Sequence, residues 1–119
     1  MKITCLMDNV ARDGYACAHG LSLYIEACSR RFLFDLGPDA GYIENARRAG
    51  IDLTKCEFAI ISHAHDDHGG GLAAFLEFCP HAPVYVREGG FEPHWSHPAP
   101  GESKAIGLDP SLAKDARIV

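Results

Sequence analysis

Short apolar runs and alternations divide the first third of the chain into predicted strands. They predict strands at residues 2–7, 21–27 and 31–36, with a turn-rich stretch between the first two. Residues 27–30 are few enough to join the second and third strands as a hairpin. We therefore expect a β-hairpin in this part of the fold.

The segment at 39–50 has the start and stop signals of a helix. Asp39 is a suitable N-cap, Arg47 and Arg48 lie in the last turn, and Gly50 is a suitable C-terminal stop. The cationic residues complement the negative end of the helix dipole. The pattern predicts one helix between the third strand and the centre of the chain.

The segment at 71–79 is a second predicted helix. Its apolar side chains recur at positions i, i+3, i+4 and i+7, namely Leu72, Phe75, Leu76 and Cys79. Such a stripe covers one side of an amphipathic helix. We expect it to face the core, and it carries no predicted chemistry.

The remaining segments complete an alternation of strands and helices. Residues 56–61 lack polar alternation, which predicts a strand buried on both faces. Residues 83–86 predict a short strand. The Gly-, Pro- and His-rich stretch at 88–107 predicts a long loop before a short helix at 109–116. This order predicts an α/β (α+β) layer protein.

Composition narrows the class of protein. The 119 residues allow one domain, 1–119, and the 47% hydrophobic and 23% charged shares are those of an ordinary globular protein. The net charge of -5 and the lack of a basic stripe make nucleic acid an unexpected partner. No segment reaches the ~20 apolar residues of a membrane span, and the N-terminal apolar run is too short for a secretory signal. We expect a cytoplasmic protein without a membrane partner.

Cysteine usage agrees with a reducing compartment. The five cysteines are odd in number and form no Cys-x-x-Cys pair, so neither a disulfide framework nor a thiolate zinc site is indicated. Cys5, Cys28 and Cys79 lie in apolar contexts, which predicts small core residues. Cys17 differs because it lies in a polar loop, two residues before His19.

The densest chemistry lies within residues 60–71. Three histidines and two aspartates occupy six positions, between the apolar run that ends at Ile61 and the glycines 69–71. Imidazole and carboxylate are ligands that suit zinc, iron or manganese. A solvated His-rich loop is the alternative. The ordered spacing and the place after a strand, where open α/β sheets bind ligands, favour a metal site.

The spacing of the motif predicts two metal ions. Residues i and i+2 of an extended chain point to one side, so His63 and His65 can hold a first ion. After a turn, Asp67 and His68 can face a second ion, while Asp66 points away. Two ions ~3.5–4 Å apart share a hydroxide and polarise a scissile group. Asp67 is the catalytic candidate because it can also hold the proton of that hydroxide.

The glycines after the motif have a predicted role as well. Gly69, Gly70 and Gly71 lack Cβ atoms and allow a tight turn. We expect this turn to bring the N-terminus of the following helix close to the site, where it could hold an anionic group of a substrate.

These residues resemble the metallo-β-lactamase-fold superfamily, whose His-x-His-x-Asp-His signature is matched in full by His63, His65, Asp67 and His68. Residues 33–37 resemble the strand-ending Asp-x-Gly element of the family. The resemblance implies that the aspartate of this element, Asp35, orients a ligand histidine.

A narrower resemblance concerns the N-terminal part. Asp8 and Asn9 after the first strand, with His19 and the residues up to 26, resemble the subgroup of dihydropterin-ribofuranosyl-aminobenzene-phosphate synthases. This resemblance makes Asp8, Asn9 and His19 candidates for supporting a metal ligand or facing the substrate.

The superfamily resemblance implies a four-layer αββα sandwich and two divalent metal ions, usually zinc and sometimes iron or manganese. It implies a metal-bound hydroxide that hydrolyses a small-molecule ester, lactone, thioester or phosphoester. The family takes its remaining metal ligands from the C-terminal half, and this chain reaches only Val119. The chain is thus expected to supply about the N-terminal half of the sandwich.

Three explanations remain open for the other ligands. In the first two, the chain is a piece of a longer protein, or a small protein that forms a homodimer across its open sheet. Alternatively, local residues complete one site, with His94, His97, His19 and Cys17 as candidates. His94 and His97 would then share one helical turn, against the alternative of a proline-rich loop near the substrate. A half-fold that binds metal without catalysis is the competing function.

Overall fold

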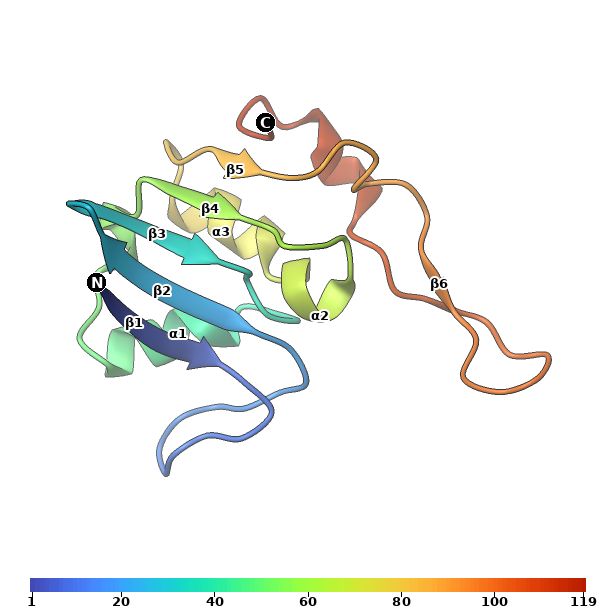
Figure 1. Cartoon of the computed structure of the whole chain (residues 1–119), viewed down its shortest axis with the longest axis horizontal. Helices are drawn as coiled ribbons and strands as arrows, with labels where there is room; N and C mark the ends of the chain where they lie inside the picture. The colour runs from blue at the N-terminus through green and yellow to red at the C-terminus, as the bar shows by residue number, and fades with distance from the viewer.

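One five-stranded sheet carries the fold (Figure 1). In the computed structural model, which describes residues 1–119, its strands lie in the order of the chain. They are β1 (Lys2–Met7), β2 (Ser22–Ala27), β3 (Arg30–Phe34), β4 (Phe58–Ile60) and β5 (Val84–Tyr85). The pairs β1–β2 and β2–β3 are antiparallel, whereas β3–β4 and β4–β5 are parallel. The predicted strands and the hairpin are confirmed.

The hairpin turn between β2 and β3 consists of two residues. Cys28 and Ser29 have φ values of 51° and 60°, and Ala27 pairs with Arg30 across the turn. Two successive residues with positive φ match the twist of the adjoining strands. This short connection fixes the register in which Tyr24 lies opposite Leu33.

Two helices cover one face of the sheet (Figure 1). Helix α1 spans Gly41–Arg48 and α3 spans Leu72–Phe78. Both predicted helices are therefore present. Asp39 lies one residue before the N-cap position, and its carboxylate accepts a hydrogen bond from the Gly41 amide at 2.8 Å. Gly50, with φ of 73°, follows the end of α1.

The core lies between the sheet and these helices. The predicted stripe of α3, together with Cys79, is buried as expected. It packs into a cluster with Leu33, Ala59 and Val84, whose side chains lie on the helical face of the sheet. Short 3-10 helices at Leu53–Lys55 and Pro110–Lys114 lie at the margin, the second where a short helix was predicted.

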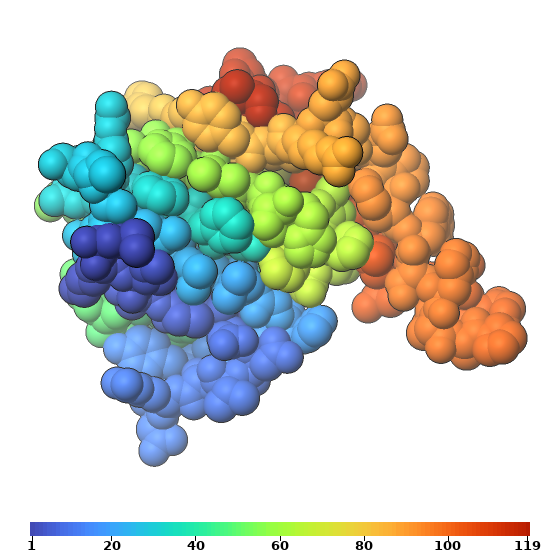
Figure 2. Space-filling view, viewed as in Figure 1, coloured from blue at the N-terminus to red at the C-terminus, as the bar shows by residue number.

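The other face of the sheet has no covering layer. Its apolar side chains form two rows across the paired strands: Ile3, Ile25, Phe32 and Phe58 in one, and Cys5, Leu23, Phe34, Ile60 and Tyr85 in the other. All nine are exposed or half-buried. Figure 2 views the molecule from this side, and no other segment lies over the strands. We call these nine residues the open face.

The open face corrects one prediction from the sequence. Burial of the segment 56–61 on both faces is wrong, because Ala59 is buried while Phe58 and Ile60 are only half-buried. The apolar run fits a strand enclosed in a sandwich. In this chain a single layer of helices encloses it from one side.

The predicted loop at 88–107 contains a small hairpin. Strands β6 (Trp95–Ser96) and β7 (Lys104–Ala105) pair antiparallel and form an arm that projects from the body (Figure 1). Four paired residues and their local hydrogen bonds define it, a signal too short to find from the sequence. Of the two alternatives for residues 94–97, the helical turn is therefore wrong, because Trp95 and Ser96 form a strand.

The cysteines and the C-terminal segment add two observations. Cys56 and Cys79 are buried, whereas Cys5 and Cys28 are exposed, which contradicts their predicted core positions. Residues 117–119 run along β5, where the Val84 amide donates to the Arg117 carbonyl at 2.8 Å. None of the helices has the length and apolar character that crossing a membrane requires.

Candidate metal centre

The histidine motif lies between the end of β4 and a one-turn helix. Residues 61–65 leave the sheet, and helix α2 (Asp66–Gly69) begins inside the motif. This turn brings His63, Asp67 and His68 together, with one ligand atom of each within 4.8 Å of the others. Three of the four predicted ligands therefore converge without any rearrangement of the chain.

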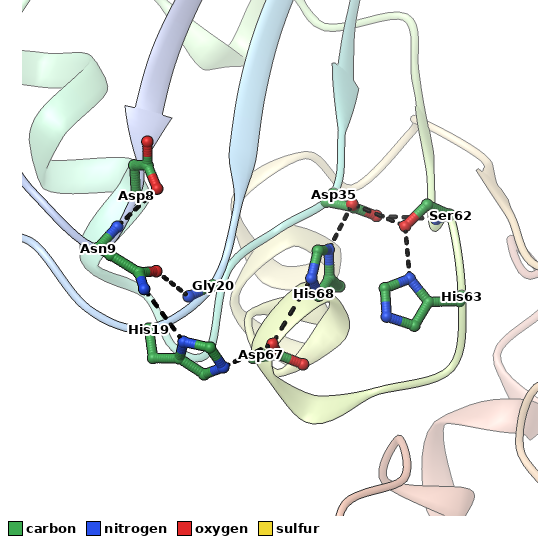
Figure 3. A network of polar contacts seen from close by, with 9 residues as sticks. All are labelled: Asp8, Asn9, His19, Gly20, Asp35, Ser62, His63, Asp67 and His68. Atoms are coloured by element: carbon green, nitrogen blue, oxygen red, sulfur yellow. Dashed lines mark hydrogen bonds and ion pairs between the residues drawn. The ribbon is translucent and has the colours of Figure 1, made fainter.

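Asp35 contacts this group from the end of β3 (Figure 3). It directly follows β3 in a left-handed conformation, with φ of 59°, and is fully buried. Its Oδ1 accepts from the Ser62 amide at 2.7 Å. Its Oδ2 accepts from the Ser62 hydroxyl at 2.8 Å and from His68 Nδ1 at 2.7 Å. One carboxylate thus contacts both the strand exit and a predicted ligand.

These contacts decide which ring nitrogens carry protons. A carboxylate only accepts, so His68 Nδ1 carries the proton in the bond to Asp35. The hydroxyl of Ser62 uses its only proton on Asp35, so it accepts from His63 Nδ1 at 2.9 Å. Both imidazoles consequently keep a free lone pair on Nε2, the form in which histidine binds a metal.

The acidic ligand faces one of these lone pairs. Asp67 Oδ2 lies 3.5 Å from His68 Nε2. Two electron-rich atoms directed at each other are poorly matched without a cation between them. The donor set of two imidazole nitrogens and a carboxylate is the type that zinc, iron and manganese bind. The residues therefore fit a divalent metal ion.

His65 lies beside the group of three. Its ring centroid is 4.6 Å from that of His63, in an edge arrangement, and it is the N-cap residue of α2. The assignment of His63 and His65 to one ion, and of Asp67 and His68 to another, stays a prediction. Burial lowers the pKa of His63, and the neighbouring His68 and His65 lower it further. His63 is thereby favoured in its neutral, metal-binding form.

His19 contacts the centre from the loop that precedes β2. Asn9 Oδ1 accepts from the Gly20 amide at 3.2 Å, so the amide nitrogen of Asn9 donates to His19 Nδ1 at 3.3 Å. The proton of His19 then lies on Nε2, 3.3 Å from Asp67 Oδ2. His19 therefore donates to a predicted ligand in this arrangement. Asp8 accepts from the Asn9 amide at 2.7 Å and contacts no histidine of the motif.

The glycines fix the backbone around the motif. A Cβ on Gly20 would collide with the Asp67 carbonyl, and the Leu21 amide donates to that oxygen at 3.2 Å. Gly70 and Gly71 pack against the main chain of residues 36–39. Helix α3 starts at Leu72, directly after this packing, and the expectation that its N-terminus lies close to the site stays a prediction. The helix that begins at the site is α2.

The other sequence candidates lie apart from the group. His97 belongs to the arm, where its Nδ1 lies 3.1 Å from the Glu102 carbonyl and 3.2 Å from Ser103 Oγ. Cys17 is an exposed thiol outside the ligand group. His94, in contrast, lies with His65 at a pocket of about 340 Å³ next to the motif.

Ser62 is a residue of the site that no sequence pattern predicted. Its hydroxyl connects Asp35 to His63, and its amide binds Asp35 directly. A signal existed, because a hydroxyl residue stood between the buried strand and the first histidine. Its partner lies 27 positions away, a pairing that only the parallel β3–β4 contact reveals.

Comparison with known proteins agrees with this geometry. The family model of the metallo-beta-lactamase superfamily matches residues 16–118. The chain belongs to the metallo-beta-lactamase superfamily. The predicted fold class, a partial metallo-β-lactamase-like domain of α/β type, is confirmed by this match and by the structural neighbours.

The crystal structure of Tm1679, a metal-dependent hydrolase of the beta-lactamase superfamily, resembles this superfamily member with a TM-score of 0.70 and 29% identity. The match covers 93% of this chain and 38% of Tm1679. An uncharacterized protein of Methanocaldococcus jannaschii is 32% identical over 75 residues, which are 63% of this chain and 29% of that protein.

The anaerobic nitric oxide reductase flavorubredoxin of Aliivibrio salmonicida is 41% identical over 51 residues, which are 40% of this chain and 10% of the flavorubredoxin. This superfamily member thus spans less than two fifths of each of these three proteins. Its residues form part of a metal-dependent hydrolase-type fold.

Proposed function

We propose that this chain is the metal-binding half of a metal-dependent hydrolase. The observation that carries the proposal is the Asp35 network, which leaves Nε2 of His63 and of His68 free in a group whose ligand atoms, with one of Asp67, lie within 4.8 Å of one another. We propose two divalent ions, with zinc favoured by the mixed imidazole and carboxylate donors and iron or manganese as alternatives. His65 is the fourth ligand from this chain.

The residues around the ions have separate tasks. A bound zinc pair supplies Lewis acidity and lowers the pKa of a coordinated water. Asp67 is the catalytic residue that accepts a proton at the centre, and His19 holds Asp67 Oδ2 through its Nε2 proton. Asp35 and Ser62 keep the ligand imidazoles in one tautomer and one orientation.

The substrate we propose is a small molecule with an ester, lactone, thioester or phosphoester bond. The pocket beside His63 and His65 has room for one, at about 340 Å³. Arg87 lines this pocket and takes part in no ion pair, so it is free to bind an anionic group of the substrate. Glu88 and Glu92 on the same wall limit how much negative charge the pocket accepts.

The proposed enzyme needs a second half. The open face presents apolar side chains that a second sheet would cover, as the partial coverage of Tm1679 supports. That sheet belongs to a C-terminal half, in the same or another polypeptide, or to a second copy of this chain in a homodimer. The remaining metal ligands come with it. We place the assembly in the cytoplasm, because all five cysteines are free thiols.

A second candidate rests on the same open face. The chain then binds metal without catalysis and uses the open face to associate with itself or with a separate half. Metal binding is common to both candidates, whereas hydrolysis belongs only to the first.

Zinc titration and a hydrolysis assay on the assembled protein test the proposal. We expect His68→Ala to weaken zinc binding at least about 10-fold, the lower bound for losing even an outer partner of a zinc ligand. It should also abolish hydrolysis of ester, lactone, thioester and phosphoester probes. His81→Ala is the matched control, since His81 is exposed and outside the ligand group. Absence of zinc binding by the unmodified protein would overturn both candidates, and zinc binding without hydrolysis would favour the second.

A further inference from the structure

Asn45 is a buried polar residue of α1, and the function proposed above gives it no task. Its side chain is 3% exposed and lies inside a helix, where asparagine has a poor propensity. Its side-chain hydrogen bonds all leave the helix. Oδ1 accepts from the Ala16 amide at 2.9 Å, and Nδ2 donates to the carbonyls of Ala16 at 2.8 Å and Leu6 at 2.7 Å. Both amide protons of the side chain are therefore used.

These bonds hold the middle of the loop at 8–20. Ala16 is bound through both its amide and its carbonyl, as a neighbouring strand would bind it. Arg48, on the next turn of α1, donates to the Gly14 carbonyl. The helix therefore fastens the loop at two points, and His19 lies only three residues after the first of them.

The loop brings His19 to the motif (Figure 3). His19 Nε2 lies 3.3 Å from Asp67 Oδ2, and the Leu21 amide donates to the Asp67 carbonyl at 3.2 Å. The side chain of His19 is 82% exposed, so packing does not hold it. Its other side-chain partner, Asn9, belongs to the same loop. The position of His19 therefore depends on how the loop itself is held.

Helix α1 also holds the other partner of this contact. Tyr42 lies one turn before Asn45, on the same side of the helix, and is fully buried. Its hydroxyl donates to the Gly71 carbonyl at 3.2 Å. Gly71 follows closely on α2, the helix that carries Asp67. One helix thus binds both the loop of His19 and the segment next to its partner.

We propose that Asn45 is a positioning residue of the metal centre, which sets the contact between His19 and Asp67 by holding the loop. The inference rests on the proposed metal centre and adds a second support to it. Asp35 orients His68 directly, whereas Asn45 acts on Asp67 only through the loop. The role requires an amide, because a carboxylate has no proton for the two carbonyls and an apolar side chain makes none of the three bonds.

Amide hydrogen exchange of the metal-free chain of 119 residues tests how the loop is held. Asn45→Ala removes three hydrogen bonds, so the Leu21 amide should exchange at least about 10-fold faster relative to the Ala59 amide. The Ala59 amide donates to the Pro83 carbonyl within the sheet and reports on the core. Ala46→Gly is the matched control, since it weakens α1 at the next position without removing a hydrogen bond and should keep the ratio of the two rates within about 2-fold.

Zinc affinity tests whether Asn45 acts through His19. Asn45→Ala should weaken zinc binding by about 10-fold, the lower bound for losing an outer partner of a ligand. The same substitution should have no further effect in a His19→Ala chain, because both remove one contact. A loss of affinity that persists undiminished in the His19→Ala chain would overturn the inference.

The outcomes separate this inference from the proposed function. Zinc binding by the unmodified chain, together with unchanged exchange of the Leu21 amide in Asn45→Ala, overturns the role of Asn45 and leaves the metal centre standing. Absence of zinc binding by the unmodified chain overturns both. A circular dichroism spectrum identifies any loss of fold in Asn45→Ala, and Asn45→Ser is then the second variant, which must show the same faster exchange.

Discussion

At the scale of single residues, Asp35 determines the geometry of the metal centre. Its left-handed backbone costs a non-glycine residue about 1–2 kcal/mol, and its carboxylate is buried with three hydrogen bonds. Residues held in such conformations concentrate at functional sites. The conformation directs the carboxylate away from the strand and toward Ser62 and His68.

Asp35→Asn should reduce zinc affinity by about 10–100-fold, the range for losing a partner that orients a metal ligand. The amide nitrogen that replaces one oxygen donates, so at least one of the three hydrogen bonds that Asp35 accepts from Ser62 and His68 is lost. Competition with a coloured chelator measures the affinity. Asp66→Asn is the matched control in the same motif, because Asp66 is outside the ligand group. Equal affinities for the two variants would contradict the role of Asp35.

His63 should titrate below the ordinary histidine pKa of about 6.5 in the metal-free chain. Burial and the neighbouring His68 and His65 disfavour its charged form. The unfolded chain then binds more protons than the folded one as pH falls below about 6.5, so His63 makes the fold less stable in acid. NMR titration of the His63 ring measures the pKa. A value at or above that of an unfolded peptide would refute the expectation.

At the scale of elements, the C-terminal segment is fastened to α3. Arg117 donates to the carbonyls of Leu76 and Cys79 at 2.6 and 3.4 Å, near the end of this helix. Asp115 accepts from the Arg117 guanidinium at 2.9 and 2.6 Å. This arrangement satisfies helix carbonyls that have no partner within the helix.

Arg117→Met should lower the free energy of unfolding by about 1–2 kcal/mol, because the hydrogen bonds to the helix carbonyls are lost. Hydrogen bonds from Arg117 lower the pKa of Asp115 to about 2. The stabilisation from this pair is therefore complete above about 4, the ordinary pKa of an aspartate. It is lost as pH falls toward 2. Urea unfolding of both chains at several pH values measures this, and a difference that persists unchanged in strong acid would contradict it.

At the scale of the whole molecule, the open face distinguishes this chain from a closed sandwich. Phe32 stacks on Phe58 with centroids 4.7 Å apart, and Phe58 contacts Tyr85 edge-on at 5.8 Å. These rings form a continuous aromatic row on the side without helices. Exposed apolar surfaces of this kind mark sites of association.

Phe32→Lys should reduce self-association of the 119-residue chain and leave it folded. Leu33→Lys, one position along β3, places the charge in the core, where burial of an unpaired charge costs several kcal/mol and should unfold the chain. Analytical ultracentrifugation and circular dichroism measure both outcomes. An unmodified chain that is strictly monomeric and binds no apolar dye would show that the open face is not an interface.

The sequence predicted most of the elements because their signals are local. The hairpin at 27–30, the stripe of α3 and the stop at Gly50 each depend on neighbouring residues. Burial of β4 on both faces was wrong because an apolar run shows what a strand prefers and not whether a second layer is present. The hairpin of the arm escaped detection because its two strands are two residues each.

The candidate site was likewise predicted only in part from the sequence. The spacing of the motif predicted four ligands in one region, and His63, Asp67 and His68 lie together there. The pairing of His63 with His65 on one ion stays a prediction. The connection from Asp35 through Ser62 to His63 depends on two parallel strands in contact, which no local pattern encodes. His94 was one local candidate among four. It lies with His65 at the pocket next to the motif, whereas His97 binds within the arm.

The shared oxygen of Asp35 has a genetic consequence. Because Asp35 Oδ2 holds His68 directly and His63 through Ser62, substitutions at 35 and 62 remove overlapping sets of contacts. Their effects on metal affinity cannot add, since interacting residues in one network show coupling energies of about 0.5–3 kcal/mol. Once Asp35 is lost, a change at Ser62 costs little more. The two positions are therefore expected to vary together among relatives, as a pair under joint selection.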